Sequence, residues 1–168
     1  MATNAQWTIG YARQADADFK MFQVMETNRS FHECHKLQFL QMACEKLVKA
    51  HLCRTGRDPA TLQTSHAFVA GHLLVVLRQQ ALFINFRGPK AREALTLGRH
   101  LAQEVDVLAP AVKRGGQRPD NCEYPWEDEK KVLHVPLDWS FHPSYLVVRP
   151  AARTILKLIR GAIERLLE

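Results

Sequence analysis

Residues 30–53 have the sequence SFHECHKLQFLQMACEKLVKAHLC, which predicts one long amphipathic helix. At about 100° per residue, its apolar side chains gather in one arc, so this helix should pack on others along one face. Glu45 and Lys49 lie outside that arc with the spacing of an i,i+4 ion pair, as expected on a solvated helix surface. Ser30 and Glu33 match a capping box, which places the start of the helix at Ser30.

The chain around this segment predicts four further helices, at about residues 16–27, 65–83, 90–109 and 150–167. Six of its eight prolines follow residue 109, so a long helix cannot cross that stretch. We therefore expect an all-α fold, an up-and-down helical bundle of about five helices with a long loop or small hairpin before the last helix. In the hairpin, residues 132–137 would pair with residues 123–126.

Length and composition predict one globular domain. The chain has 168 residues, of which 46% are hydrophobic and 24% charged, as in an ordinary domain of that size. No apolar run approaches the roughly 18 to 20 residues of a membrane span, and the first residues do not resemble a signal peptide. We expect a single domain over residues 1–168, with 111–144 as an inserted loop, in a soluble cytoplasmic protein that has no membrane partner.

The net charge of +6 is unevenly distributed along the chain. Residues 51–118 contain ten Lys and Arg against four acidic residues, whereas residues 119–144 contain two against six. A basic surface of this kind suits a polyanion such as RNA. The exteriors of ordinary solvated helices have the same composition, so both interpretations stay open.

Arg29 and His35 are separated by five residues and flank the start of the predicted helix, where they could form a simple ribonuclease site. Arginine can hold a phosphate and histidine can move the 2′-hydroxyl proton, so cleavage of RNA would need no metal ion. His32 and Cys34 add metal-ligand chemistry to the same helix, but a helix turns Cys34 away from the two histidines. We predict no metal site and no cofactor. His51 lies within the apolar arc and is predicted to be a core histidine.

The aromatic residues of the 111–144 loop have two possible uses. Tyr124, Trp126 and Trp139 lie in this acidic segment. Their rings either pin the loop to the bundle or offer stacking faces to a base.

Two segments resemble the HEPN family, which consists of small all-helical domains found in prokaryotic defence and toxin–antitoxin systems. Residues 43–50, ACEKLVKA, are similar to the family's A-x-E-K-x-x-K-A helix end, and residues 64–68, TSHAF, are similar to its T-H-D-L helix start. The resemblance implies a homodimer that binds RNA or a nucleotide in a toxin–antitoxin or phage-defence system, with metal-independent endoribonuclease activity as an option.

Active family members carry an Arg-x4-6-His motif on a late helix, and this chain departs from that pattern. Its corresponding segment, residues 118–124, is RPDNCEY and has no histidine. It is similar to a loop of the nucleotidyltransferase-associated members. The residues that this interpretation places against RNA or a nucleotide are Arg118, Asn121, Tyr124, Trp126 and His66.

Three proton carriers therefore remain open: His35, His66 and His134. A different class of function also fits the sequence. The chain would then be a non-catalytic protein-interaction module whose acidic loop and basic helices dock a partner such as a nucleotidyltransferase or an antitoxin.

Overall fold

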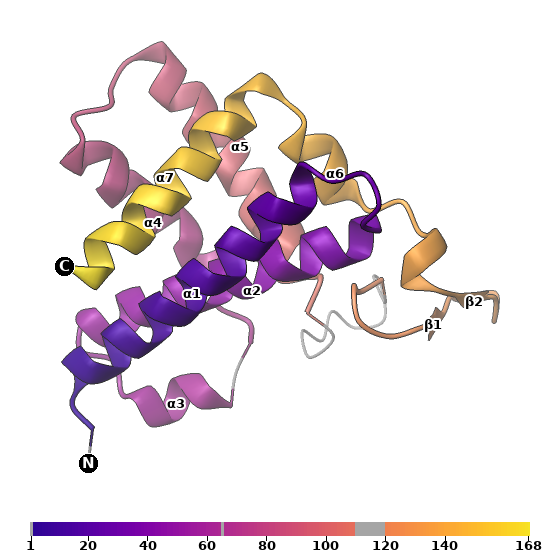
Figure 1. Ribbon diagram of the computed structural model, residues 1–168, viewed down its shortest axis with the longest axis horizontal. Helices are drawn as coiled ribbons and strands as arrows, with labels where there is room; N and C mark the ends of the chain where they lie inside the picture. Colours follow the sequence, from indigo (N-terminus) through magenta and orange to yellow (C-terminus); the bar gives the residue numbers. More distant parts are fainter. Residues whose placement is uncertain (1, 65, 110–119) are drawn as a thin grey trace.

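The computed structural model describes residues 2–64, 66–109 and 120–168, and it confirms the all-α prediction (Figure 1). The described residues form a helical bundle with one two-stranded hairpin. The elements, in chain order, are α1 (Asn4–Glu26), α2 (Glu33–Arg54), α3 (Pro59–Gln63), α4 (Val69–Phe83), α5 (Pro89–Asp106), β1 (Trp126–Glu127), β2 (Leu133–His134), a 3-10 turn (Pro136–Asp138), α6 (His142–Val147) and α7 (Pro150–Leu167). No helix within these ranges is both long and apolar enough to cross a membrane.

Helix α2 is the central element of the bundle. Helix α1 packs along it, and α4, α5 and α7 also contact it (Figure 1). About two turns near its C-terminal end are therefore enclosed, and every residue from Leu47 to Cys53 is buried. A helix covered by several neighbours has no fully solvated face, so polar residues of α2 that the periodicity places outside the apolar arc are buried as well.

One hydrophobic core joins the helices and the hairpin. Its largest fully buried side chains come from α1, α2, α4, α5, α7 and the segment before α6, and they include Phe19, Phe22, Leu40, Leu47, Leu77, Leu101, Phe141 and Ile155. Trp126 of β1 belongs to the same cluster. The hairpin is thus attached to the bundle, at the end away from the C-terminus (Figure 1).

The capping box predicted at Ser30 is wrong, and the observed one begins α1. Helix α2 starts at Glu33 without a side-chain cap. The backbone N–H and hydroxyl of Ser30 instead donate to Asn28 Oδ1, at 2.9 and 2.8 Å, so a local turn uses these groups. Thr3 and Gln6 cap α1 reciprocally. This helix therefore starts twelve residues before the predicted Asp16.

The helix predicted over residues 65–83 starts later, at Val69. Asp106, the last residue of α5, supplies the cap: its Oδ1 accepts from the backbone N–H groups of Val69 and Ala70, at 3.0 and 3.2 Å. A carboxylate at this position satisfies two orphan donors and favours the positive end of the helix. Because the cap comes from another helix, periodicity along the chain gives no sign of it.

The second half of the chain follows the predictions more closely. Helix α7 spans Pro150–Leu167 as predicted, and α5 ends three residues before the predicted Ala109. The hairpin is confirmed, with Trp126 opposite His134, but its strands have only two residues each. Helix α6 was not predicted. Residues 111–119 of the predicted 111–144 loop lie outside the described ranges.

Candidate functional site

A pocket of about 330 Å³ lies beside the middle of α2. Four separate parts of the chain line it: α2, the segment before α4, the residue Ala109 after α5, and the turn that leads to β1. The lining residues are Gln41, Met42, Glu45, Lys46, His66, Ala109, Glu123 and Tyr124. Its volume falls within the range of small-molecule sites, about 300 to 1,000 Å³.

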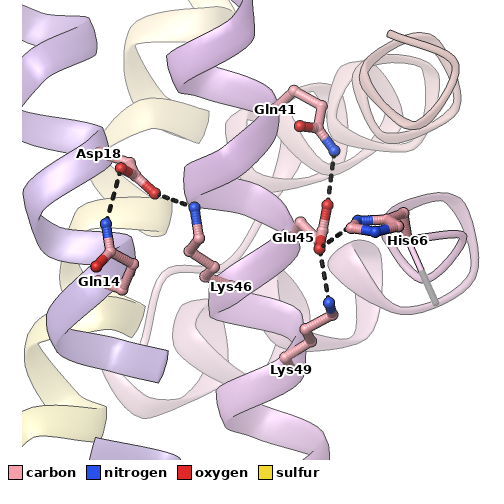
Figure 2. Close-up of polar contacts among 7 residues, drawn as sticks. All are labelled: Gln14, Asp18, Gln41, Glu45, Lys46, Lys49 and His66. Atoms are coloured by element: carbon pink, nitrogen blue, oxygen red, sulfur yellow. Dashed lines mark hydrogen bonds and ion pairs between the residues drawn. The ribbon is translucent and has the colours of Figure 1, made fainter. Parts of the chain in front are cut away.

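Glu45 is the centre of a polar network on the pocket wall (Figure 2). Lys49 Nζ lies 2.7 Å from Glu45 Oε1, and Gln41 Nε2 donates to Oε2 at 3.0 Å. His66 Nδ1 lies 3.0 Å from Oε1. The predicted ion pair is confirmed, but its position on a solvated surface is wrong, because Glu45 and Lys49 are only 7% and 4% exposed.

The surroundings of Glu45 keep its carboxylate ionised. Burial raises the pKa of this carboxyl, but the hydrogen bonds from Lys49 and Gln41 and the positive charges of Lys49 and His66 outweigh burial. The pKa of Glu45 therefore lies below its ordinary value. A permanent negative charge is thus held against the His66 ring.

His66 is the member of this network that solvent and a ligand can reach. Its side chain is 45% exposed, whereas that of Glu45 is 9% exposed. With Nδ1 on the carboxylate, Nε2 makes no hydrogen bond to any residue in the described part of the chain. A carboxylate in this position orients the imidazole, as in the histidine and aspartate pair of hydrolases.

Lys46 lines the pocket with its stem, but its charge is already paired. Its Nζ lies 2.6 Å from Asp18 Oδ2, and Gln14 Nε2 donates to Asp18 Oδ1 at 3.2 Å. Figure 2 shows this contact bridging α1 and α2 while the Glu45 network extends to the other side of α2. With Glu123 also on the lining, the pocket has two carboxylates against one lysine, so it is slightly acidic rather than basic.

A tight turn presents Tyr124 to the pocket. Asn121 is buried, and its Oδ1 accepts from the backbone N–H groups of Glu123 and Tyr124, at 2.9 and 2.7 Å. Tyr124 remains 60% exposed, so its ring face is open. Of the predicted ligand residues, the structure brings together His66 and Tyr124, and it gives Asn121 a positioning role behind Tyr124.

Trp126 lies in a packed aromatic cluster and does not line the pocket. It is 8% exposed, and its ring centroid is 5.4 Å from that of Trp139 and 6.5 Å from that of Phe141. His134 packs on Trp139 at 4.8 Å and bonds Asp128 Oδ2 at 3.1 Å. These contacts pin the hairpin to the bundle, so the ring of Trp126 is not an open stacking face.

The predicted pair Arg29 and His35 lies away from the pocket, around the start of α2. Both side chains are exposed: Arg29 in the turn before the helix, and His35 in its first turn, against the His32 ring. Neither lines the pocket. His35 precedes Glu45 by ten residues, which is about 15 Å along a helix. Arg118 lies outside the described residues.

The sequence interpretation missed both Glu45 and Gln41 as residues of this candidate site, since it placed Glu45 only in a surface ion pair. Gln41 precedes Glu45 by four residues, as Glu45 precedes Lys49, so three polar groups follow one i,i+4 row of α2. This i,i+4 row is the sequence pattern that could have identified Gln41. No sequence pattern predicts the contact of His66 with Glu45, because it joins residues 21 positions apart.

Neither a metal-binding cluster nor similarity to a known protein helps to assign this site. The described residues contain no group of three or more His, Cys, Asp or Glu side chains placed to hold a metal ion. The chain matches no family model, no curated protein and no solved structure.

Proposed function

We propose that this chain binds RNA in the pocket beside Glu45 and that His66 is the proton carrier of an endoribonuclease reaction. The contact between His66 Nδ1 and Glu45 Oε1, at 3.0 Å on the wall of a pocket, is the observation that carries the proposal. It supplies an oriented imidazole with one ring nitrogen open to a ligand. The Tyr124 ring on the same pocket adds a stacking face for a base.

The reaction would proceed by attack of the substrate's own 2′-hydroxyl. His66 Nε2 accepts the proton of that hydroxyl while its oxygen forms a bond to the neighbouring phosphorus. The bond from phosphorus to the 5′-oxygen breaks, and a proton from water neutralises the leaving oxygen. The products are a 2′,3′-cyclic phosphate and a 5′-hydroxyl end. Glu45 does not touch the substrate and acts by positioning His66.

The first test is cleavage of a single-stranded RNA in EDTA by the wild type and by His66→Ala. Loss of a general base costs about 10² to 10⁴ in rate, so we expect His66→Ala to lose cleavage and to keep its fold by circular dichroism. His35→Ala is the matched control, because it removes the other candidate histidine from an exposed site on α2. If His66→Ala cleaves RNA at the wild-type rate and His35→Ala does not cleave it, the assignment of His66 as the proton carrier is wrong.

Binding is tested separately with Tyr124→Ala. Stacking of a base on an aromatic ring contributes about 1 to 3 kcal/mol, so RNA should bind this variant about five- to 150-fold more weakly. Tyr145→Ala is the control, because Tyr145 is also a solvent-exposed tyrosine, 62% against 60%, but does not line the pocket. Equal affinity of both variants for RNA would exclude Tyr124 from the site.

A second candidate function is a non-catalytic module that docks a partner protein. The exposed C-terminal end of α4 and the residue that follows it favour this function, since Leu82, Phe83 and Ile84 are 63%, 65% and 53% exposed. Consecutive apolar residues open to solvent are typical of an interaction surface. If the wild type neither cuts nor retains RNA at low salt, where electrostatic attraction is strongest, this function replaces the first.

A further inference from the structure

A groove with arginines on both walls lies between α5 and the start of α7. Its volume is about 550 Å³, larger than that of the pocket beside Glu45. The lining residues are Pro89, Arg92, Glu93, Thr96, Leu97 and His100 from α5, and Arg149, Pro150 and Ala151 around the start of α7. The two pockets share no residue, so the groove is a separate site.

Arg92 and Arg149 are exposed and have no hydrogen-bonding or ionic partner for their side chains among the described residues. Arginines at other helix junctions do have such partners. Arg160 of α7 pairs with Asp16 and Glu164, and Arg165 Nε donates to Gln80 Oε1 at 2.9 Å. The guanidinium groups of the groove therefore add nothing to the contacts between helices and remain available to a ligand.

The charge and the floor of the groove define the ligand. Glu93 is its one acidic lining residue, so the two arginines leave the groove positive. Buried Leu97 and the rings of Pro89 and Pro150 give an apolar floor. Guanidinium groups bind phosphate oxygens in bidentate fashion, and an apolar floor accepts a flat ring or a sugar face.

We propose that this groove binds a phosphate group attached to an aromatic moiety, which is the chemistry of a nucleoside phosphate. The phosphate lies between Arg92 and Arg149, and the base or sugar lies on the proline and leucine floor. A free nucleotide and one nucleotide unit of an RNA strand both present this chemistry. The proposal requires neither His66 nor cleavage, so it stands or falls independently of the proposed function.

The test compares 5′-AMP with adenosine by calorimetry, and a single-stranded oligoadenylate by fluorescence anisotropy over a salt series. Arg92→Gln/Arg149→Gln removes both guanidinium groups. Arg78→Gln/Arg87→Gln is the matched control, because it removes the same charge from two exposed arginines that do not line the groove. His66→Ala/Tyr124→Ala shows whether the other pocket contributes.

We expect the wild type to bind 5′-AMP at least about tenfold more tightly than adenosine, since only 5′-AMP offers a phosphate to the charge-assisted bonds of the two guanidinium groups. The groove variant should lose at least about tenfold in affinity for 5′-AMP, while the control and the His66→Ala/Tyr124→Ala variant retain it. With oligoadenylate, loss of the one phosphate contact that the two arginines share should reduce the slope of log K against log salt by about 0.7.

The two arms separate the sources of the phosphate. If the groove variant loses affinity for oligoadenylate alone, the groove binds an RNA strand. If it also loses affinity for 5′-AMP, the groove binds a free nucleotide as well. Both results support the site. The proposal is overturned if the groove variant binds both ligands as the control does. It is also overturned if the wild type binds neither, or if it binds 5′-AMP no better than adenosine with no change of salt slope in the groove variant. A chain without RNA cleavage can still give every supporting result.

Discussion

At the residue scale, Glu45 and Lys49 form an ion pair whose members depend on each other. Moving a charge out of water costs several kcal/mol, and only a close partner and further hydrogen bonds offset that cost. Gln41 and His66 complete the bonding of the carboxylate. Lys49 Nζ also lies 5.9 Å from the centroid of the Tyr11 ring, whose face attracts a cation. Loss of one charge would leave the other buried without a counter-charge.

Lys49→Met should therefore destabilise the protein by about 3 to 5 kcal/mol, because it leaves the Glu45 carboxylate buried and without its counter-charge. Glu45→Gln/Lys49→Met should recover most of that loss, since no net charge is then buried. Lys20→Met is the control: it breaks the exposed pair with Asp16 and should cost at most about 1 kcal/mol. Urea denaturation measures all three, and equal costs for Lys49→Met and Lys20→Met would contradict the burial of the pair.

The pH dependence of stability gives a second prediction for Glu45. Its folded pKa is below the unfolded value of 4.5, so the stabilisation is fully present above 4.5 and is lost as pH falls through the folded value. In Glu45→Gln/Lys49→Met this carboxyl no longer titrates. Its stability should fall less steeply than that of the wild type over that acid range. Parallel curves from denaturation at several pH values would show that the pKa of Glu45 is not lowered.

At the element scale, close contact between helices depends on small residues. A Cβ placed on Gly161 of α7 would lie 2.6 Å from Gln80 Nε2 of α4. Gln80 is buried, and its Oε1 already accepts from Arg165 Nε at 2.9 Å. The amide therefore cannot move aside without losing that bond. Gly10 of α1 has no atom within 4 Å of the same position.

The two glycines should respond to alanine in opposite directions. Gly161→Ala crowds a packed contact and should cost about 1 to 3 kcal/mol. Gly10→Ala only removes backbone freedom from an exposed helix position, so it should stabilise by about 0.5 to 1 kcal/mol. Thermal unfolding followed by circular dichroism gives the sign of each change. A stabilising Gly161→Ala would mean that α4 and α7 are less closely packed at this point.

Prediction of the elements succeeded where the signals are local and failed where they are tertiary. Helix α7 has proline in its first turn and a regular apolar stripe, and its observed limits match the predicted ones. The start of α4 depends on Asp106, 37 residues away, and could not be found along the chain. The same division applies to the candidate site. The i,i+4 spacing of Glu45 and Lys49 is visible in the sequence, but their burial depends on the helices that surround α2 and could not be predicted from it.

At the scale of the whole molecule, charged groups serve two different purposes. Some join elements: Lys46 with Asp18 connects α2 to α1, and Arg160 with Asp16 connects α7 to α1. Others, such as Arg92 and Arg149, have no such partner among the described residues. The net charge of +6 thus includes cations that the bundle does not use for its own packing. Sequence counts alone could not separate these two sets.

The buried end of α2 makes the stability of the whole bundle sensitive to pH near neutrality. Burial lowers the pKa of His51, and the positive charges of Arg165 on α7, His72 on α4 and Arg54 lower it further. The folded protein therefore binds this proton less readily than the unfolded chain. The stabilisation is fully present above the unfolded value of 6.5 and is lost as pH falls through the folded pKa.

His51→Gln should remove this component while it keeps a polar side chain of similar size. The wild type should lose stability relative to the variant as pH falls from above 6.5 through the folded pKa of His51. His100→Gln is the control, because His100 is exposed and other titrating groups are unchanged. Denaturation curves at several pH values measure the difference. If His51→Gln and His100→Gln follow the wild type in parallel, protonation of His51 is not coupled to the packing of α2, α4 and α7.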